Sequence, residues 1–541
     1  MKKIKICLSL FLTVFLFISC KKEAVLHELN IIPEPEEMKI VPGEFEINKK
    51  TRILFSDNKD VERIANFFSE ELANYGLKIE KEILSGNSDT SYTVIFELHK
   101  TIYNDPEAYV VKTSENAVKI SATDPKGLFY GYQTLKQLLP VNYEDKPFIP
   151  MVEIFDTPQF KWRGMHLDVC RHFFRKEFVM KYIDYLASVK MNTFHWHLSE
   201  DQGWRIEIKA YPFLTETGAW RNETVIGHAR NKPAEFDGKK YGGFYTQEDI
   251  KEIVKYASDR FITIVPEIEM PGHAQAAIAS YPFLGCTEDE VDVWTTWGVS
   301  PYIYNLEDTT FAFLKTVLSE VIELFPGKYI HIGGDEAPKE QWKKSKRIQQ
   351  QMKELGLKDE HELQSYFVQR IEKFLNSKAK ILIGWDEILE GGLAPNAVVM
   401  SWRGTEGGIE ASKAGHYVVM SPGTHCYFDH YQSEDTDNEP LAIGGFTDVE
   451  KVYSFNPIPE ELTEEEANFI MGAQANVWSE YISTPEHVEY MIFPRMLALS
   501  EVLWSAADKK DYYDFLKRLT HYRAVMDREG INYAKHVFVS E

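Results

Sequence analysis

The sequence predicts an α/β protein in which a (β/α)8 barrel follows a smaller α/β domain. The length of 541 residues is too great for one typical domain and sufficient for a barrel with a smaller partner. In the second part of the chain, eight short apolar runs alternate with helical stretches, and nearly every run ends in polar side chains. We therefore expect the smaller domain at residues 25–157 and the barrel at residues 158–541.

Turn and capping signals divide the smaller domain into short strands and one clear helix. Asp124 followed by Pro125 is typical of an N-cap and a first helical position, and the apolar pattern continues to Leu139 before Pro140 ends it. Short β-rich segments precede this helix, and we predict strands at 51–55, 93–98, 109–112 and 117–121.

The apolar runs after residue 158 suit a parallel sheet that is buried on both faces. We predict barrel strands at 162–168, 192–198, 262–269, 329–334, 380–385, 397–402, 416–421 and 471–478. The helical stretches 176–190, 246–260 and 307–325 are long enough to be crossover helices. A doubly wound open sheet has the same local pattern, so the pattern alone does not separate the two folds.

The residues at the strand ends favour the barrel over the open sheet. A buried core does not need polar side chains there, whereas the C-terminal rim of a TIM barrel carries them. The strand-end residues are Asp168, His197, Glu269, Asp335 with Glu336, Trp385 with Asp386, Trp402 with Arg403, and Trp478 with Glu480.

The first residues have the pattern of a secretory signal, which we place at residues 1–19. Three lysines within the first five residues precede an apolar run from Ile6 to Ile18. The segment ending in Ser19-Cys20 resembles a bacterial lipoprotein cleavage site with Cys20 as the acylated residue, although Phe17 stands where leucine is commonest. We expect an exported protein, periplasmic or anchored in the outer membrane through a lipid. Ordinary cleavage nearby with a soluble product is the alternative.

The net charge and the cysteine content exclude several kinds of binding partner and site. The 60 basic and 83 acidic residues give a net charge of −23, which repels nucleic acid and anionic membranes, so we expect no nucleic-acid partner. After Cys20 only Cys170, Cys286 and Cys426 remain, and their spacing provides neither a disulfide framework nor a paired metal-ligand motif. The sequence sets no expectation for the oligomeric state.

The sharpest chemical motif is His331-Ile-Gly-Gly-Asp335-Glu336, in which an apolar strand leads into two glycines and two adjacent carboxylates. Glycines allow a tight turn and the close approach of a substrate. Because neighbouring carboxylates repel each other, we expect at least one of the two to have a raised pKa, as a general acid requires. A solvated acidic turn is the structural alternative.

This motif resembles the signature of glycoside hydrolase family 20, the β-N-acetylhexosaminidases. Four further segments resemble family blocks in the family order, at 162–172, 195–205, 266–273 and 472–480. The resemblance covers residues 160–505, and the helix at 127–139 resembles part of the α/β domain that precedes the barrel in this family. It implies an enzyme that removes terminal, non-reducing β-linked GlcNAc or GalNAc from an oligosaccharide or glycoconjugate.

The adjacent acids suit a mechanism in which the substrate provides the nucleophile. A usual retaining glycosidase holds two carboxyl groups about 5 Å apart across the sugar, and adjacent residues are ill placed for this because they project in different directions. In the mechanism implied by the resemblance, the 2-acetamido oxygen attacks the anomeric carbon to form an oxazolinium intermediate. Glu336 protonates the leaving oxygen and then activates water, and Asp335 holds the acetamido N–H.

The resemblance also implies supporting roles around the acid. It assigns His273 and Asp201 to a relay behind Glu336, and a loop-capping role is the alternative for either residue. Tyr427 is expected to donate to the acetamido oxygen, and Asp429 to bind a sugar hydroxyl. The far hydroxyls of a terminal sugar are the expected ligands of two further residues, Arg171 and Glu480.

Tryptophans at three strand ends are expected to line the sugar site. Trp385, Trp402 and Trp478 each follow a barrel strand, where flat indole faces can stack on a pyranose and enclose an acetamido methyl group. Each tryptophan taken singly is equally compatible with a core position. Their shared placement favours the binding role.

We predict neither a cofactor nor a metal. There is no His-Glu-x-x-His, phosphate loop or dinucleotide fingerprint in a suitable context. His195 and His197 share a strand face and are possible metal ligands, but they lack supporting ligands in the sequence.

Two other functions stay open, a glycan-binding lipoprotein without turnover and a disaccharide-releasing relative in the same family. The intact acid pair favours the hydrolase over the binding protein, and Arg171, Asp429 and Glu480 favour a single terminal sugar.

Overall fold

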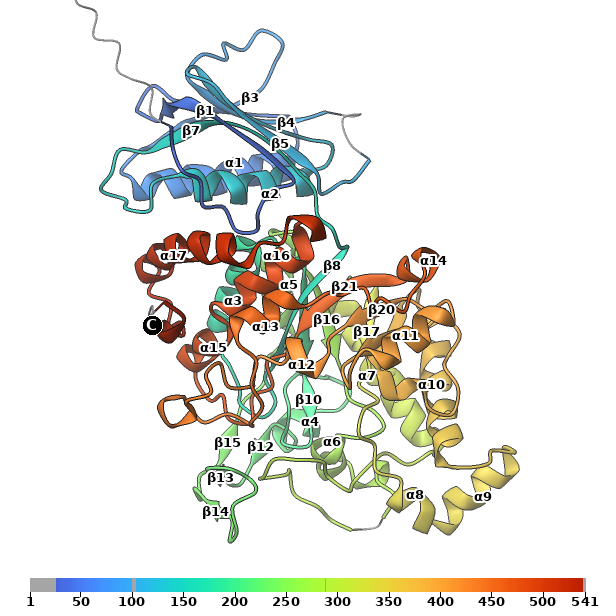
Figure 1. Ribbon diagram of the computed structural model, residues 1–541. Coiled ribbons are helices and arrows are strands. Elements are labelled where there is room, and N and C mark those ends of the chain that lie inside the picture. The colour runs from blue at the N-terminus through green and yellow to red at the C-terminus, as the bar shows by residue number, and fades with distance from the viewer. Residues whose placement is uncertain (1–25, 100–103, 288, 539–541) are drawn as a thin grey trace, which may run out of the picture.

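A seven-stranded mixed sheet and a closed eight-stranded barrel form the two domains of the computed structural model, which describes residues 26–99, 104–287 and 289–538 (Figure 1). The predicted signal segment and Cys20 lie outside the described residues. Among the helices described, none has the length and apolar character needed to cross a bilayer.

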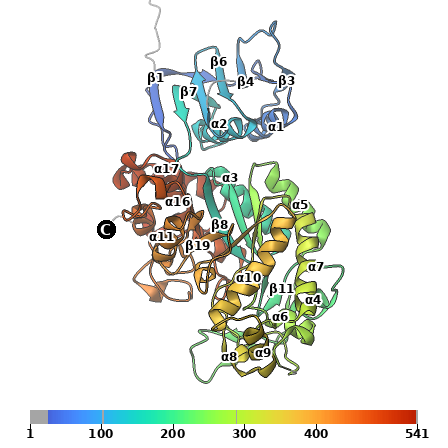
Figure 2. The same ribbon diagram turned by 90° about the vertical axis from the view of Figure 1, so that its right-hand side faces the viewer.

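The N-terminal domain packs two helices against one face of its sheet. Helices α1 (Lys59–Asn74) and α2 (Pro125–Leu138) lie between this sheet and the barrel domain (Figures 1 and 2). The strand order is β1 (Glu37–Glu46), β7 (Phe148–Asp156), β5 (Tyr109–Thr113), β6 (Ala117–Ala122), β4 (Thr93–Leu98), β2 (Arg52–Phe55) and β3 (Glu80–Ile83). The four strands predicted from the sequence are confirmed as β2, β4, β5 and β6.

Helix α2 begins where its capping residues predict. The side chain of Asp124 accepts a hydrogen bond of 2.9 Å from the Lys126 amide, and Pro125 occupies the first helical turn. A Cβ on Gly127 would lie 2.3 Å from the carbonyl oxygen of Ala108, so only glycine allows the helix to approach the sheet this closely.

The barrel consists of eight parallel strands, one at each of the predicted apolar runs. The strands are β8 (Trp162–Asp168), β9 (Thr193–His197), β16 (Thr263–Glu267), β17 (Tyr329–His331), β18 (Ile381–Trp385), β19 (Val398–Ser401), β20 (Val418–Met420) and β21 (Ile470–Ala475). Strand β21 pairs with β8, which closes the ring. The (β/α)8 prediction is therefore confirmed, and the open-sheet alternative is excluded.

Helices surround the barrel, and the predicted crossover helices are confirmed as the first three of them. The principal helices are α3 (Lys176–Ser188), α5 (Gln247–Ser258), α7 (Asp308–Leu324), α10 (Glu360–Ser377), α11 (Glu406–Lys413), α13 (Val449–Ser454), α16 (Arg495–Trp504) and α17 (Tyr512–Arg528). In both views the loops that follow the strands lie at the end of the barrel opposite the N-terminal domain (Figures 1 and 2).

A buried ionic cluster joins the two domains. Lys190 Nζ lies 2.8 Å from Asp156 Oδ2, and the exposed fraction of both side chains is 0%. Lys190 also donates to the Tyr109 hydroxyl, and the indole N–H of Trp504 donates to Asp156 Oδ1. The charge of each ion is therefore compensated by several partners, as burial requires.

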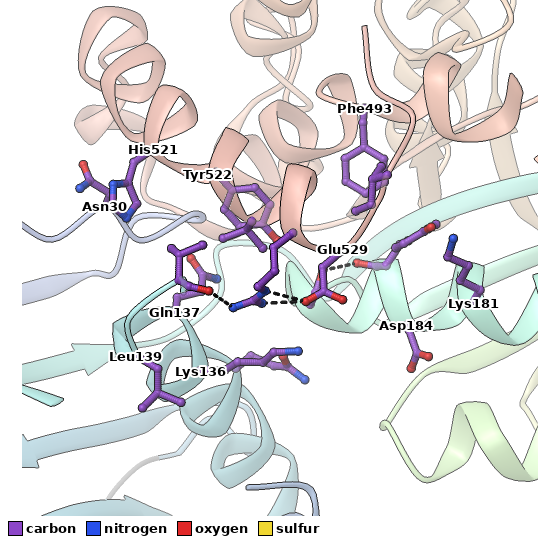
Figure 3. Close-up of a pocket in the computed structure, with 17 residues that line it drawn as sticks. Asn30, Lys136, Gln137, Leu139, Lys181, Asp184, Phe493, His521, Tyr522 and Glu529 are labelled. Carbon is purple, nitrogen blue, oxygen red and sulfur yellow. Dashed lines mark hydrogen bonds and ion pairs between the residues drawn. The ribbon is translucent and has the colours of Figure 1, made fainter. Parts of the chain in front are cut away.

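A cavity of about 200 Å³ lies at the same interface, and Figure 3 shows its lining. Lys136 and Leu139 line it from α2 and its C-cap, Asp184 from α3, and Tyr522 from α17, with Glu529 just beyond that helix. It lies at the end of the barrel that faces the N-terminal domain, away from the strand-end residues.

Candidate active site

The C-terminal rim of the barrel contains a second cavity, of about 330 Å³. All predicted site residues except Asp201 line it. Its lining residues are Arg171, Arg230, His273, Asp335, Glu336, Trp385, Trp402, Tyr427, Asp429, His430, Ile443, Gly444, Gly445, Trp478 and Glu480. Residues from several strand ends and the loops that follow them therefore meet at one place, as a TIM-barrel site requires.

The two adjacent acids project differently from the loop after β17. The side chain of Asp335 is 12% exposed, whereas that of Glu336 is 46% exposed. The backbone reaches this arrangement through left-handed φ angles at Gly333, Gly334 and Glu336, of 68°, 94° and 45°. Glycine adopts such angles without strain, but glutamate does so at a cost, which is typical of functional positions. The loop thus directs one carboxyl inward and the other towards the cavity mouth.

The pKa of Glu336 is raised, in line with the expectation that one member of the pair has a raised pKa. Burial is the larger cause, and the negative charge of Asp335 adds to it, while the charge of His273 opposes it. Because nearly half of the Glu336 side chain is exposed, solvent moderates the shift. Glu336 therefore keeps its proton to a higher pH than an ordinary glutamate, as a general acid must.

Behind the pair lies Glu269, a buried carboxyl group whose side chain is 1% exposed. Neither of its carboxyl oxygens has a hydrogen-bond partner within the described ranges. Burial, together with the charge of Asp335, raises the pKa of Glu269 well above its usual range. A Cβ on Gly333 would come within 1.8 Å of Glu269 Oε2, so this carboxyl explains the first glycine of the motif.

One ring nitrogen of His273 faces the acid pair. The other ring nitrogen faces the neighbouring carboxylates Glu200 and Asp201. Its Nε2 lies 3.5 Å from Asp335 Oδ2 and 3.8 Å from Glu336 Oε2. Its Nδ1 lies 3.3 Å from Asp201 Oδ2 and only 2.7 Å from Glu200 Oε1. The predicted relay residues are thus brought together, but the nearer partner of the imidazole is Glu200, which sequence reasoning missed. Its signals were its position beside Asp201 and its place in the 195–205 segment that resembles a family block.

The negative charges around His273 raise its pKa by more than burial lowers it. Burial alone lowers the pKa of an imidazole, but the carboxylates of Glu200 and Asp335 hold the pKa of His273 well above its usual range. Asp201 also accepts hydrogen bonds of 2.9 Å from the Gln275 amide and 3.2 Å from the Ser300 amide. The sequence left two roles open for Asp201, contact with His273 and capping of a loop. In the structure Asp201 makes both kinds of contact.

The three predicted tryptophans form walls of the cavity. The Trp402 indole N–H donates to Glu387 Oε2 at 3.0 Å, and its ring stacks with that of Tyr427 at a centroid distance of 6.1 Å. Trp385 and Trp478 have ring centroids 5.8 Å apart. Glu387 is a further residue that sequence reasoning missed, although it belongs to an acid pair directly after β18. Burial, followed by the charge of Asp335, raises the pKa of Glu387 to about 8.

Polar side chains form another part of the cavity lining. Arg171 Nη1 lies 3.3 Å from Asp168 Oδ2, and Arg171 Nη2 lies 4.0 Å from Glu480 Oε1. Within the part of the chain described, Arg171 Nε and Asp429 Oδ1 are buried without a hydrogen-bond partner. Buried polar atoms are normally paired, so these two atoms are available to a polar ligand such as a sugar hydroxyl.

Comparison with known proteins agrees with this geometry. The family model "Glycosyl hydrolase family 20, catalytic domain" matches residues 160–507, and "Glycosyl hydrolase family 20, domain 2" matches residues 28–157. The chain belongs to glycosyl hydrolase family 20. The resemblance seen in the sequence motifs is therefore confirmed over both domains.

Relatives of this family 20 chain are found among characterised proteins and solved structures. A β-hexosaminidase of Porphyromonas gingivalis is 46% identical over 514 residues, which are 93% of this chain and 64% of the relative, so the chain spans just under two thirds of that protein. The solved exo β-N-acetylglucosaminidase of Vibrio harveyi, in complex with N-acetylglucosamine, has a TM-score of 0.81 and 32% identity, covering 94% of this chain and 79% of that one. The β-N-acetylhexosaminidase of Bacteroides fragilis has a TM-score of 0.79 and 29% identity, covering 94% and 99%.

A cluster of histidines in the family 20 barrel surrounds one carboxylate below the cavity. Glu267 Oε2 lies 3.1 Å from His195 Nε2 and also contacts His197 Nδ1, and Glu267 Oε1 lies 2.7 Å from His331 Nδ1. Among the described residues, two groups that include Glu267 have the spacing of metal ligands, one with His166 and His195 and one with His197 and Glu269. However, Gln474 Nε2 donates to His195 Nδ1 at 2.8 Å, so the proton of a neutral His195 lies on Nε2 and faces Glu267. The histidine directs an N–H at the carboxylate, which does not fit a shared cation.

Two cationic or titratable residues of the rim were also missed by sequence reasoning. Arg230 and His430 line the mouth of the cavity. They come from loops far apart in the chain. Arg230 lies in a loop without a motif, whereas His430 directly follows the predicted site residue Asp429, which was a signal for it. His228 Nε2 and the Ile443 carbonyl oxygen are 3.2 Å apart, which joins these two loops beside the cavity.

Proposed function

We propose that this chain is an exo-acting β-N-acetylhexosaminidase that hydrolyses terminal, non-reducing β-linked GlcNAc or GalNAc with retention of configuration. The observation that carries the proposal is the adjacency of Asp335 and Glu336 on one loop, beside a cavity that is also lined by the polar residues Arg171, Asp429 and Glu480. A cavity of about 330 Å³ is at the small end of ligand sites, which supports the binding of one sugar rather than a chain.

The acid pair supports a substrate-assisted reaction. The acetamido oxygen of the bound sugar attacks the anomeric carbon, and the electrons of the glycosidic bond pass to the leaving oxygen as Glu336 protonates it. The resulting oxazolinium ion is opened by water, which Glu336 deprotonates, and two displacements at one carbon retain the β configuration. Asp335 accepts the acetamido N–H and stabilises the positive charge of the intermediate.

The remaining lining residues supply the specificity in this proposal. The indoles of Trp385, Trp402 and Trp478 enclose the acetamido group and the sugar face. Arg171 and Asp429 pair with the distal hydroxyls, because each has a buried atom free for a ligand in the described structure. Recognition of the distal hydroxyls of one terminal sugar by these residues makes the action exo.

Hydrolysis of paired substrates tests this function. We expect the mature protein to release p-nitrophenol from the β-GlcNAc and β-GalNAc glycosides but not from the β-glucoside, which lacks the acetamido group. A thiazoline mimic of the bicyclic intermediate should inhibit strongly. Equal turnover of the GlcNAc and glucose substrates would indicate an enzymic nucleophile instead. Saturable binding of GlcNAc without turnover of any substrate would identify a glycan-binding protein.

We further propose that the protein is exported as a lipoprotein of the periplasm or outer membrane. The lysines and apolar run of the first nineteen residues and the position of Cys20 support this proposal. Metabolic labelling with a palmitate analogue should label the native protein but not Cys20→Ala. An unlabelled, soluble native protein would contradict the anchor and leave ordinary signal cleavage.

A further inference from the structure

The cavity between the two domains is lined by a buried amide without a partner. Gln133 lies on helix α2, and only 6% of this residue is exposed. Within the described ranges of the chain, its side-chain amide makes no hydrogen bond. The residue lines the cavity of about 200 Å³ that Figure 3 shows. Since buried polar groups are normally paired, this amide indicates a site for a polar group of a ligand.

A second cavity, of about 380 Å³, adjoins the first one. Five residues line both cavities and therefore lie at their junction, namely Gln133, Lys136, Asp184, Ser188 and Glu529. We call the two cavities together the interdomain groove. The first cavity alone is smaller than a typical small-molecule site, whereas the groove as a whole has the size of one.

Apolar side chains from both domains line the first cavity. Leu139 lies on the side of the N-terminal domain, and Phe493 and Tyr522 lie on the side of the barrel domain (Figure 3). Phe493 is 1% exposed and Tyr522 is 6% exposed. Aromatic rings of this kind offer flat apolar faces, which pack against methyl groups and against the apolar faces of sugar rings.

The charged side chains of the first cavity are already paired. Each lysine, arginine, aspartate and glutamate in its lining has an oppositely charged partner at 3.4 Å or less. The pairs are Lys136 with Glu71, Lys181 with Glu489, Asp184 with Arg260, and Arg528 with Glu529. A charged ligand would be desolvated there without a free counter-charge, which is unfavourable. The site therefore suits a neutral ligand.

The amide of Gln133 determines which polar group fits. A side-chain amide presents an acceptor oxygen beside an NH₂ donor, and its best complement is another amide, which offers both an N–H and a carbonyl oxygen. A carboxylate offers acceptors only, and it is charged. The ligand that fits the groove is thus a neutral molecule with an amide, a small apolar group and a ring face.

We propose that the interdomain groove is a second, non-catalytic binding site for an N-acetylated sugar, whose acetamido group pairs with Gln133 and whose methyl group and ring pack on Phe493 and Tyr522. The choice of a sugar rests on the proposed function, because that reaction releases GlcNAc or GalNAc. The groove shares no lining residue with the active-site cavity and lies at the other end of the barrel (Figures 1 and 2). Both sites can therefore be occupied at the same time.

The position of the groove predicts an effect of binding on stability. Helix α2 belongs to the N-terminal domain, whereas α3 and α17 belong to the barrel domain, and all three line the first cavity. A ligand that contacts both domains binds only when they are folded and docked. Occupancy of the groove should therefore raise the Tm of the protein.

The test measures binding of GlcNAc to protein whose active site is filled with the thiazoline inhibitor. In saturation-transfer NMR, the acetamido methyl group of GlcNAc should give a saturable signal, and Tm should rise by about 1 °C at about ten times Kd. Gln133→Leu should weaken this binding about 10-fold or more, because the acetamido group loses its partner. The matched control is Gln350→Leu, at an exposed position of α9 (Lys346–Glu354), and it should bind GlcNAc as the wild type does.

Two further ligands separate the amide from the sugar. Glucose lacks the acetamido group and should give no saturable signal. N-acetylglycine methylamide has the acetamido group without the sugar ring and should bind more weakly than GlcNAc. Tighter binding of this amide would overturn the assignment of a sugar. Equal binding of GlcNAc to the wild type and to Gln133→Leu, or no binding to either, would overturn the site itself.

These outcomes are distinct from a failure of the proposed function. Binding in the groove is measured without turnover, as the difference between the wild type and Gln133→Leu. A wild-type protein that hydrolyses no acetamido glycoside would refute the proposed function, whatever that difference is.

A second variant covers the case in which Gln133→Leu does not fold. Val525 lies on α17 and lines the first cavity, and Val525→Trp places an indole into that space from the barrel side while Gln133 is kept. We expect this variant to lose the GlcNAc signal in the thiazoline-saturated protein and to keep the thiazoline affinity of the wild type. A GlcNAc signal of wild-type strength in Val525→Trp would contradict binding in the groove.

Discussion

The indole nitrogen of Trp385 lies 2.9 Å from Oε1 of Glu267, a carboxylate in the barrel interior. Both residues are buried, with exposed fractions of 1% for Trp385 and 0% for the Glu267 side chain. Histidines on neighbouring strands hold Glu267, and they keep its pKa well below its usual range despite its burial. One wall of the sugar cavity is therefore anchored to a fixed charge in the core.

A double-mutant cycle tests this anchor. Trp385→Phe removes the N–H and keeps an aromatic wall, and Glu267→Gln removes the charge and keeps an acceptor. If Glu267 acts on the site through Trp385, Glu267→Gln should lower kcat/KM less in the Trp385→Phe background than in the wild type, with a coupling energy of about 0.5 to 3 kcal/mol. Additive losses across the four proteins would show that the two residues act independently.

Glu336→Gln should nearly abolish the cleavage of glycosides with poor leaving groups. General acid catalysis contributes about 10²- to 10⁴-fold, so we expect a loss of that size on methyl β-GlcNAc. A 2,4-dinitrophenyl leaving group needs no proton, and its first burst of release should persist. Burst-phase and steady-state measurements of both substrates check this. A comparable loss on both substrates in the burst phase would argue against the acid role.

Asp335→Asn should weaken the acetamido nucleophile and also change the pH profile. Loss of a charge aimed at the intermediate costs about 10²- to 10³-fold in kcat. The charge of Asp335 raises the pKa of Glu336, so its removal lowers that pKa, and the basic limb should move to lower pH. A basic limb at the wild-type position would contradict the electrostatic coupling of the pair.

Glu387→Gln should stabilise the protein increasingly as the pH rises above about 4.5. The pKa of Glu387 is raised from its usual value of 4.5 to about 8, chiefly by burial. The folded state therefore resists ionisation, and the stability of the wild type falls as pH rises between these two values and reaches its lower level above about 8. Glutamine keeps an acceptor for the Trp402 indole. Thermal unfolding should give similar Tm values at pH 4 and a higher Tm for the variant at pH 9, and a constant difference would contradict the assignment.

Lys190→Met should destabilise the junction between the two domains. It leaves Asp156 as a buried charge without its cation, which costs about 3 to 5 kcal/mol of the free energy of unfolding. The double variant with Asp156→Asn should recover part of this loss. Urea unfolding provides the measurement. Lys181→Met is the control, since its ion pair with Glu489 has a 48% exposed lysine and should contribute less than about 1 kcal/mol. Equal losses for the two lysines would refute the role of the cluster.

Local sequence patterns predicted much of the fold. The eight apolar runs became the eight barrel strands because each pattern reflects burial on both faces of a parallel sheet, a property of the segment itself. Asp124 and Pro125 likewise marked the start of α2 through interactions within one turn. The strand-end positions of Asp335 and Trp385 placed them at the same rim, because parallel strands in a barrel end on one side.

The sequence by itself determined the barrel, the family and the composition of the site, but the tertiary structure decided which side chains are partners. Glu200 and Asp201 are adjacent carboxylates with the same local signals, yet Glu200 is the nearer to His273, 73 positions away. The Glu267 anchor of Trp385 spans 118 positions. Such pairings depend on the conformations of loops from different strands and on differences of a fraction of an ångström. No periodicity or capping pattern in the sequence encodes these pairings, because the residues come together only when the barrel strands close into a ring.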